Sequence, residues 1–107
     1  GQVGEAAMSA YGSSKGAVIA LTRSLAAEFA HDRINVNAIA PGFIKTEMNA
    51  AYLESISSEQ ISTLEKRHLL GFGAPEDVAY AVAYLLAETG RWVTGTVMNV
   101  DGGLTAI

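Results

Sequence analysis

The chain has 107 residues, of which half are hydrophobic and 17% are charged, a composition typical of one globular domain and not of a disordered chain. Its net charge is −4 and its seven basic residues are dispersed, so no nucleic-acid surface is expected. The apolar runs are too short to span a bilayer, the chain does not open on a basic-then-apolar signal pattern, and there is no cysteine. We therefore expect no membrane partner, no disulfide and a cytoplasmic location.

The first predicted element is a long helix that follows a segment of small residues. Gly1 to Met8 has no periodicity and predicts a loop, and Ser9 is a suitable N-cap. Apolar residues then recur at helical spacing, at Val18, Leu21, Leu25 and Phe29. The helix should end near His31-Asp32-Arg33, because cations are favoured at the negative end of the helix dipole.

Tyr11 and Lys15 lie four residues apart on this helix, so they share one face, about 6 Å apart along the axis. A tyrosine hydroxyl has a reference pKa of about 10, too high for ready proton exchange at neutral pH. A neighbouring ammonium favours the phenolate and lowers that pKa towards the range of a general acid or base. A half-buried tyrosine beside a solvated lysine gives the same spacing, so the catalytic interpretation depends on the rest of the chain.

The helix is apolar on nearly every side, which predicts burial on two sides, either in a large core or against another subunit. Gly12, Gly16 and Ala20 recur every four residues. Such a strip of small residues allows a ligand or a neighbouring helix to come close to the backbone.

Residues 34–40 predict a strand, with Ile34, Val36 and Ala38 on one face. Asparagine is depleted in strands, so Asn35 and Asn37 are expected to tie neighbouring loops down by hydrogen bonds. Pro41-Gly42 ends the strand, and Phe43 to Thr46 leads out of it. In open α/β sheets ligands bind beyond the carboxyl ends of the strands, so this turn lies where a ligand would.

Residues 47–70 are more polar and predict either two short helices forming a lid or a plain surface excursion. Ser57 and Gln60 match a capping box. Gly71-Phe72-Gly73 is a loop and not a dinucleotide motif, because Glu76 stands where the third glycine would be. No metal site is expected, since His31 and His68 lie far apart in the sequence.

A second helix starts at Pro75-Glu76-Asp77 and should end at Gly90 as its C′ residue. Its core stripe is formed by Val78, Val82, Leu85 and Leu86. Thr96 to Val100 is a short apolar strand. The fold class is therefore α/β, but two strands are too few for a parallel sheet that needs both faces covered. The pattern predicts the C-terminal half of a doubly wound, Rossmann-like parallel sheet, and Gly1 in place of Met hints that the chain is part of something longer.

Several motifs occur in an order that resembles the C-terminal part of the short-chain dehydrogenase/reductase family. They are Tyr11-x-x-x-Lys15, Asn35 to Gly42 with Thr46, Pro75-Glu76-Asp77-Val78, Thr94-Gly95 and Val100-Asp101-Gly102-Gly103. The resemblance covers essentially all of the chain, and it is most similar to 3-oxoacyl-carrier-protein reductases and related sugar or polyol dehydrogenases. It implies an NAD- or NADP-dependent oxidoreductase that transfers a hydride between nicotinamide and a carbonyl or alcohol substrate.

The resemblance also assigns roles to residues. Tyr11 matches the catalytic acid/base, and Lys15 matches the residue that bonds the nicotinamide ribose and lowers the tyrosine pKa. The loop from Pro41 to Thr46 resembles the nicotinamide-holding loop, with Gly42 in its turn and with the Ile44 backbone and the Thr46 hydroxyl at the carboxamide. The resemblance further implies a homodimer or homotetramer.

The family's Gly-rich cofactor turn, its residue selecting NAD or NADP and its catalytic Ser are expected upstream of Gly1. Ser9 is too close to Tyr11 to be that Ser, and Ser13 and Ser14 lie inside the motif. Residues 1–107 are thus expected to form the C-terminal part of a single oxidoreductase domain that lacks its N-terminal cofactor-binding half. The alternative is a truncated, non-catalytic chain that acts only in association with others. The substrate is not identified by the sequence.

Overall fold

The computed structural model describes the backbone of residues 2–106 and the side chains of residues 12–106. Helices are α1 (Gln2–Phe29), α2 (Glu47–Ser55), α3 (Ser58–Lys66) and α4 (Pro75–Leu86), and strands are β1 (Ala38–Pro41) and β2 (Val97–Val100). Short 3-10 turns lie at η1 (Ala30–Asp32), η2 (Glu88–Gly90) and η3 (Leu104–Ala106). No helix within the described range is long and apolar enough to cross a membrane.

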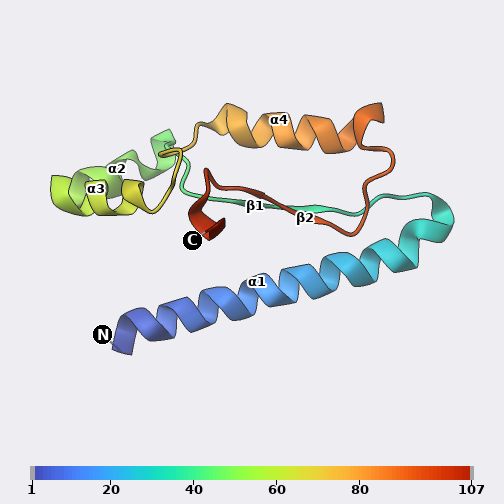
Figure 1. The fold of residues 1–107 in the computed structure, drawn as a ribbon, viewed down its shortest axis with the longest axis horizontal. Helices are drawn as coiled ribbons and strands as arrows, with labels where there is room; N and C mark the ends of the chain where they lie inside the picture. Colours follow the sequence, from blue (N-terminus) through green and yellow to red (C-terminus); the bar gives the residue numbers. More distant parts are fainter. Residues whose placement is uncertain (1, 107) are drawn as a thin grey trace.

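The two strands pair in parallel, with Ala38 opposite Val97 and Pro41 opposite Val100. Helix α4 covers one face of the pair and α1 runs beneath the other, while α2 and α3 lie at one end (Figure 1). The α/β class, the two parallel strands and the helices on both faces are therefore confirmed. The carboxyl ends of both strands point toward the end that carries α2, α3 and η3 (Figure 1).

Helix α1 is longer than the sequence pattern predicted. It begins at Gln2, so the loop expected over Gly1 to Met8 is wrong for the described residues and Ser9 is not its N-cap. The segment from Glu5 to Met8 consists of good helix formers, and their propensity extends the helix past the isolated glycine at position 4. At the other end α1 passes into η1 and Arg33 adopts a left-handed conformation with φ of 59°, which confirms the predicted end of the helix.

The predicted strand over residues 34–40 is shorter than expected, because the ladder begins at Ala38. Residues 35–37 are tied to the segment before β2 mainly through side chains, with one backbone bond from Gly95 N–H to Val36 O. The Asn35 amide donates to the carbonyls of Gly90 and Arg91, and the Asn37 amide donates to Val93 O and accepts from Thr96 N–H. The interpretation of the two asparagines as ties between neighbouring loops is confirmed.

The segment between the strands forms two short helices, and each begins at a capping box, of which the sequence predicted only the one at Ser57. Thr46 caps α2 with Asn49 in a capping box, and Ser57 caps α3 with Gln60 in the same way. Helix α4 has Pro75 at its first position as predicted. Its end was predicted wrongly, since α4 stops at Leu86 and Gly90 lies buried in η2. Glycine is needed there for space, because a Cβ at position 90 would lie 2.6 Å from the carbonyl oxygens of Leu85 and Tyr84.

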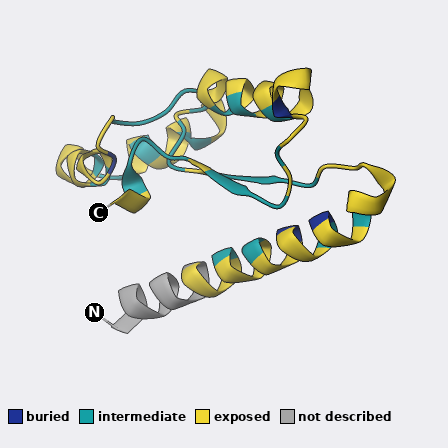
Figure 2. Ribbon diagram, turned by 45° about the vertical axis from the view of Figure 1, so that its right-hand side comes forward, coloured by how far each residue is buried: buried dark blue, intermediate teal, exposed yellow. Residues whose placement is uncertain are grey.

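The core is very small. Ala26, at 5% exposure, is the one buried apolar residue among the described side chains, and exposed residues dominate the helices in Figure 2. The predicted core stripes of α1 and α4 are only partly covered, since Leu21 is 59% and Leu86 82% exposed. The total accessible surface is 7877 Å², whereas a compact protein of this mass exposes about 5,700 Å². Two strands are too narrow to cover a 28-residue helix, which leaves about 2,200 Å² of extra surface.

Candidate functional site at the carboxyl edge of the sheet

The carboxyl ends of β1 and β2 meet the loops that follow them at one edge of the sheet. Gly42 follows β1 and donates its N–H to Val100 O at 3.1 Å. The Cα of Gly42 lies so close to Asp101 that a Cβ at position 42 would be 2.9 Å from Asp101 Cα. Glycine at position 42 therefore lets the two loops touch. A cavity of about 570 Å³ opens beside this contact, with a wall formed by Gly42 to Ile44, Asn99 to Gly103, residues 70–73, Asp77 and Tyr80.

Lys15 reaches this edge from below. Its Nζ donates to Asn99 Oδ1 at 3.2 Å, which joins α1 to the last strand. With Ser14 and Val18, Lys15 also lines a smaller cavity of about 250 Å³, whose other wall is Ile39 to Pro41 with Val97. The structure thus brings Lys15, Pro41 and Gly42 to one edge, where Asn99, in the wall of the larger cavity, accepts the hydrogen bond of Lys15 from the smaller one.

Tyr11 lies in α1, one turn before Lys15, so the predicted helical spacing of the pair is present in the backbone. Its side chain lies outside the described residues. The glycine strip at Gly12 and Gly16 has open space around it, since a Cβ at either position would meet nothing within 4 Å among its surroundings.

The loop from Pro41 to Thr46 is held by hydrogen bonds along its whole length. Phe43 N–H donates to His68 Nε2, Gly73 N–H donates to Phe43 O, and Lys45 N–H donates to Gly73 O, each at 3.0 Å. Asn49 anchors the far end, where its side chain donates to Ile44 O and accepts from Thr46 N–H.

Among the groups of this loop that make no hydrogen bond within the described residues, two are suited to bind an amide. One is the N–H of Ile44. The other is the hydroxyl hydrogen of Thr46, whose oxygen accepts from Asn49 N–H at 3.3 Å. A carboxamide presents one acceptor and two donors. A backbone N–H and, two residues later in the same loop, a hydroxyl that still has donor and acceptor capacity are groups of the kind that bind it.

Asp101 supplies the negative charge at this edge. Thr105 Oγ1 donates to its Oδ2 at 2.7 Å, and the N–H groups of Gly103 and Thr105 donate to the same carboxylate. The Thr105 hydroxyl is the main cause that holds the pKa of Asp101 below its ordinary value, and the ammonium of Lys15 acts in the same direction. Asp101 therefore stays ionised and fixes the turn after β2.

Sequence reasoning missed two residues of this edge. Asn99 lies in a short apolar strand, where asparagine is unusual, and the same signal identified Asn35 and Asn37. His68 was considered only as a metal ligand, and no pattern in the sequence connects it with Phe43.

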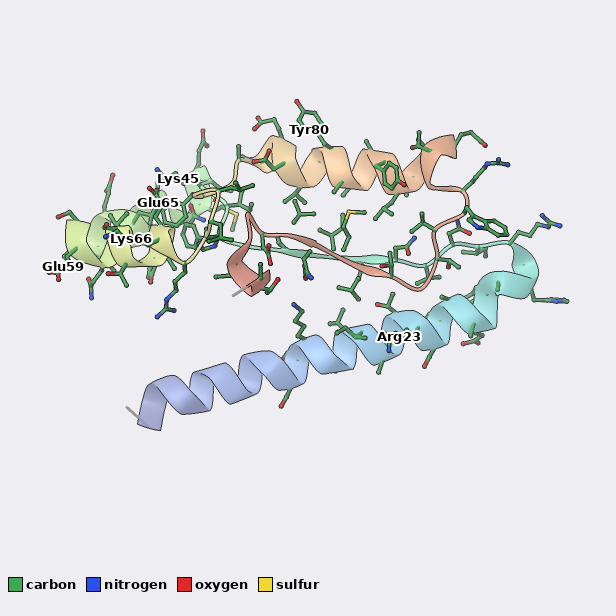
Figure 3. The ribbon with its side chains drawn as sticks, viewed as in Figure 1. Arg23, Lys45, Glu59, Glu65, Lys66 and Tyr80 are labelled. Atoms are coloured by element: carbon green, nitrogen blue, oxygen red, sulfur yellow. The ribbon has the colours of Figure 1, made fainter. Side chains whose placement is uncertain are left out.

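Within the described residues no cluster of three or more His, Cys, Asp or Glu side chains could hold a metal ion. Figure 3 places Lys45 at the end of the molecule that carries α2 and α3, and Tyr80 on α4.

The chain is similar to known proteins over its whole length. The family model described as enoyl-(acyl carrier protein) reductase matches residues 1–105. The 2-(S)-hydroxypropyl-CoM dehydrogenase 3 of Xanthobacter autotrophicus is 42% identical over all of this chain and 43% of its own length. The 3-oxoacyl-(acyl-carrier-protein) reductase of Rickettsia prowazekii is 38% identical, again over all of this chain and 43% of the relative. The chain thus spans less than half the length of these curated relatives.

Solved structures share the arrangement of helices and strands. A 4-hydroxyisoleucine dehydrogenase complexed with NADH superposes with a TM-score of 0.81 at 36% identity, over 92% of this chain and 40% of the other. A structure described as a 2-deoxy-D-gluconate 3-dehydrogenase of Agrobacterium tumefaciens, with bound NADP, gives 0.79 at 38% identity over 91% and 39%. The chain therefore belongs to the short-chain dehydrogenase/reductase family, and it matches the C-terminal part of the family's longer Rossmann-fold enzymes.

Proposed function

We propose that the full-length protein containing this chain is an NAD(P)-dependent oxidoreductase that interconverts a carbonyl and an alcohol. The observation that supports this most is the convergence of Lys15, the loop from Pro41 to Thr46 and the carboxyl ends of both strands at one edge. That edge is where open α/β sheets bind ligands. The solved relatives with bound NADH or NADP support the same assignment.

In this proposal Tyr11 is the general acid/base that exchanges a proton with the substrate oxygen. Lys15 is the charge on the same helical face that stabilises the phenolate and bonds the ribose hydroxyls. The bond from Lys15 to Asn99 holds the ammonium at the carboxyl edge until ribose hydroxyls take part in its hydrogen bonding.

The residues present fit a nicotinamide dinucleotide at this edge. Lys15 would bind the ribose, the Ile44 N–H and the Thr46 hydroxyl would bind the carboxamide, and Pro41 and Gly42 would shape the wall of the site. When bound, the cofactor supplies the hydride that the amino-acid side chains lack. Nothing in this part of the chain selects NAD over NADP.

The substrate is a small-molecule carbonyl or alcohol, and we infer that α2 and α3, which lie at the same end of the molecule, form a lid over it (Figure 1). We also propose a homodimer or homotetramer. The 2,200 Å² of surface beyond that of a compact chain, estimated above, is of the size that an extended core and a subunit interface would cover.

The second candidate is a chain without catalysis that acts only in association. It has one specific support: the inactive 2-(S)-hydroxypropyl-CoM dehydrogenase 2 of Xanthobacter autotrophicus is also 42% identical to this chain. Similarity of this degree therefore occurs in a relative whose name denotes loss of activity.

The test is Tyr11→Phe in the full-length protein, assayed by NADH and NADPH oxidation with a panel of 3-oxoacyl thioesters, ketoses and cyclic ketones. Turnover should fall at least about a hundredfold, the usual range for a lost general acid, while cofactor binding stays near normal. Tyr84→Phe is the matched control, because Tyr84 lies in the last turn of α4 and lines neither cavity at this edge. Near-normal turnover of Tyr11→Phe would remove Tyr11 from the mechanism, and no turnover of any substrate by the parent would favour the non-catalytic candidate.

A further inference from the structure

His68 is a buried histidine that no step above uses. Only 4% of its surface is exposed, and it follows Arg67, the C-cap of α3, in the chain. Its Nε2 lies 3.0 Å from Phe43 N and its Nδ1 lies 3.0 Å from Leu64 O. An amide N–H can only donate and a carbonyl can only accept, so these partners assign the proton to Nδ1 and the lone pair to Nε2. The ring is held as one neutral tautomer.

The ring connects two parts of the molecule that are far apart in sequence. Leu64 lies in α3, one of the two helices inferred above to form the lid, whereas Phe43 lies in the loop from Pro41 to Thr46. The aromatic side chains make the same connection. The ring of Phe72 lies 4.9 Å from that of Phe43 and 5.7 Å from the His68 ring, which meets it edge to face.

Both backbone groups of Phe43 are hydrogen-bonded. Its N–H donates to His68, and its carbonyl accepts from Gly73 N–H at 3.0 Å. Ile44, whose N–H remains unused, follows directly. The two hydrogen bonds of Phe43 therefore fix the position of the Ile44 N–H, and His68 provides the one of the two that comes from a side chain. Lys45, Glu65 and Lys66, labelled in Figure 3, belong to the same end of the molecule.

We propose that His68 is a positioning residue that couples the lid helix α3 to the cofactor loop and fixes the Ile44 N–H toward the nicotinamide. This inference rests on the proposed function for its kinetic consequence, but the hold of His68 on the loop is independent of it. The imidazole is suited to the task because it accepts from the loop and donates to the lid through one rigid ring.

The experiment compares His68→Leu, which removes both hydrogen bonds, with His68→Gln, whose amide retains an acceptor and a donor. Both are made in the full-length protein. Amide hydrogen exchange is followed over residues 42–46 and, as an internal reference, over α4. Cofactor KM and kcat are measured with NADH and NADPH.

His68→Leu should speed exchange in residues 42–46 about tenfold, the effect of one lost hydrogen bond to a buried amide, and leave α4 within threefold. The KM for the cofactor should rise about tenfold, with a smaller fall in kcat. His68→Gln should recover most of the exchange protection and most of the KM. Unchanged exchange over 42–46, or equal acceleration in α4, would show that His68 only stabilises the fold and would overturn the proposal. So would a failure of His68→Gln to recover either quantity.

A measurement on the unaltered protein tests the proposal even if a variant does not fold. Nitrogen-15 NMR of the His68 ring should show a protonated Nδ1 and an unprotonated Nε2. The opposite tautomer would overturn the proposal. A parent protein that binds neither NADH nor NADPH would refute the proposed function instead, and the exchange and NMR results would still decide whether His68 holds the loop.

Discussion

Replacing Gly42 with alanine tests whether the contact between the two loops builds the site. The new Cβ would lie 2.9 Å from Asp101 Cα and 3.0 Å from both Asp101 Cβ and Asp101 O. All three atoms belong to, or branch directly from, the backbone of the turn after β2, so no side-chain rotation relieves the clash. The loop and the turn must therefore separate, which strains the bond from Gly42 N–H to Val100 O.

Gly73→Ala is a matched comparison with a shorter clash. A Cβ at position 73 would lie 2.7 Å from Ile44 Cδ1, the far end of a flexible side chain. Ile44 can turn away at a cost of about 0.5–1.5 kcal/mol. Neither glycine has a positive φ, so the two substitutions differ in sterics and not in backbone conformation.

We expect Gly42→Ala to lower the free energy of unfolding by about 1–3 kcal/mol, the usual cost of overpacking, and Gly73→Ala to cost less. For a protein of 150–250 residues each kcal/mol corresponds to roughly 2–4 °C in Tm. Displacing the loop should also weaken NADH or NADPH binding in Gly42→Ala more than in Gly73→Ala.

The assay is urea unfolding of both full-length variants, followed by fluorescence titration with each cofactor. If Gly73→Ala were the more damaging variant by either measure, contact distance would outweigh the rigidity of the contacted atoms and the reasoning would be refuted.

Lys15→Met should raise the cofactor KM and shift the basic limb of the pH–rate profile to higher pH, because the cation that stabilises the Tyr11 phenolate is gone; an unchanged profile would leave Lys15 a solvated charge. Thr105→Val removes the main donor that lowers the pKa of Asp101, so that pKa, followed by carbon-13 NMR titration, should rise. A carboxyl group whose pKa is lower in the folded state stabilises the fold at pH values above its unfolded-state pKa, and this stabilisation is lost as the pH falls through its folded-state pKa. The parent and the variant should therefore differ in stability above about pH 4 and converge below it. The 107 residues alone, with their extra exposed surface, should self-associate and bind neither NADH nor NADPH tightly; micromolar binding by a well-folded monomer in calorimetry and sedimentation would contradict this.

Local patterns in the sequence predicted most of the elements, together with the starts of α3 and α4. Pro75 and the capping boxes at Thr46 and Ser57 act within a few residues of chain, as does the stop at Pro41 after β1, so their effects do not depend on the rest of the fold. Of these, the box at Thr46 was not recognised beforehand, because Asn49 takes the place of the usual Glu or Gln. The ordered motifs identified the family for the same reason, since each is a contiguous run of residues.

The tertiary structure alone decided the contacts between segments that lie far apart in the chain. No periodicity shows that the Asn99 amide meets Lys15 across 84 residues, or that His68 accepts a hydrogen bond from Phe43. The short β1 was also set by such contacts, because the side chains of Asn35 and Asn37 bond backbone groups of residues 90–96 in place of a longer strand ladder. Local propensity is a property of neighbouring residues, whereas these bonds form only when folding brings distant residues together.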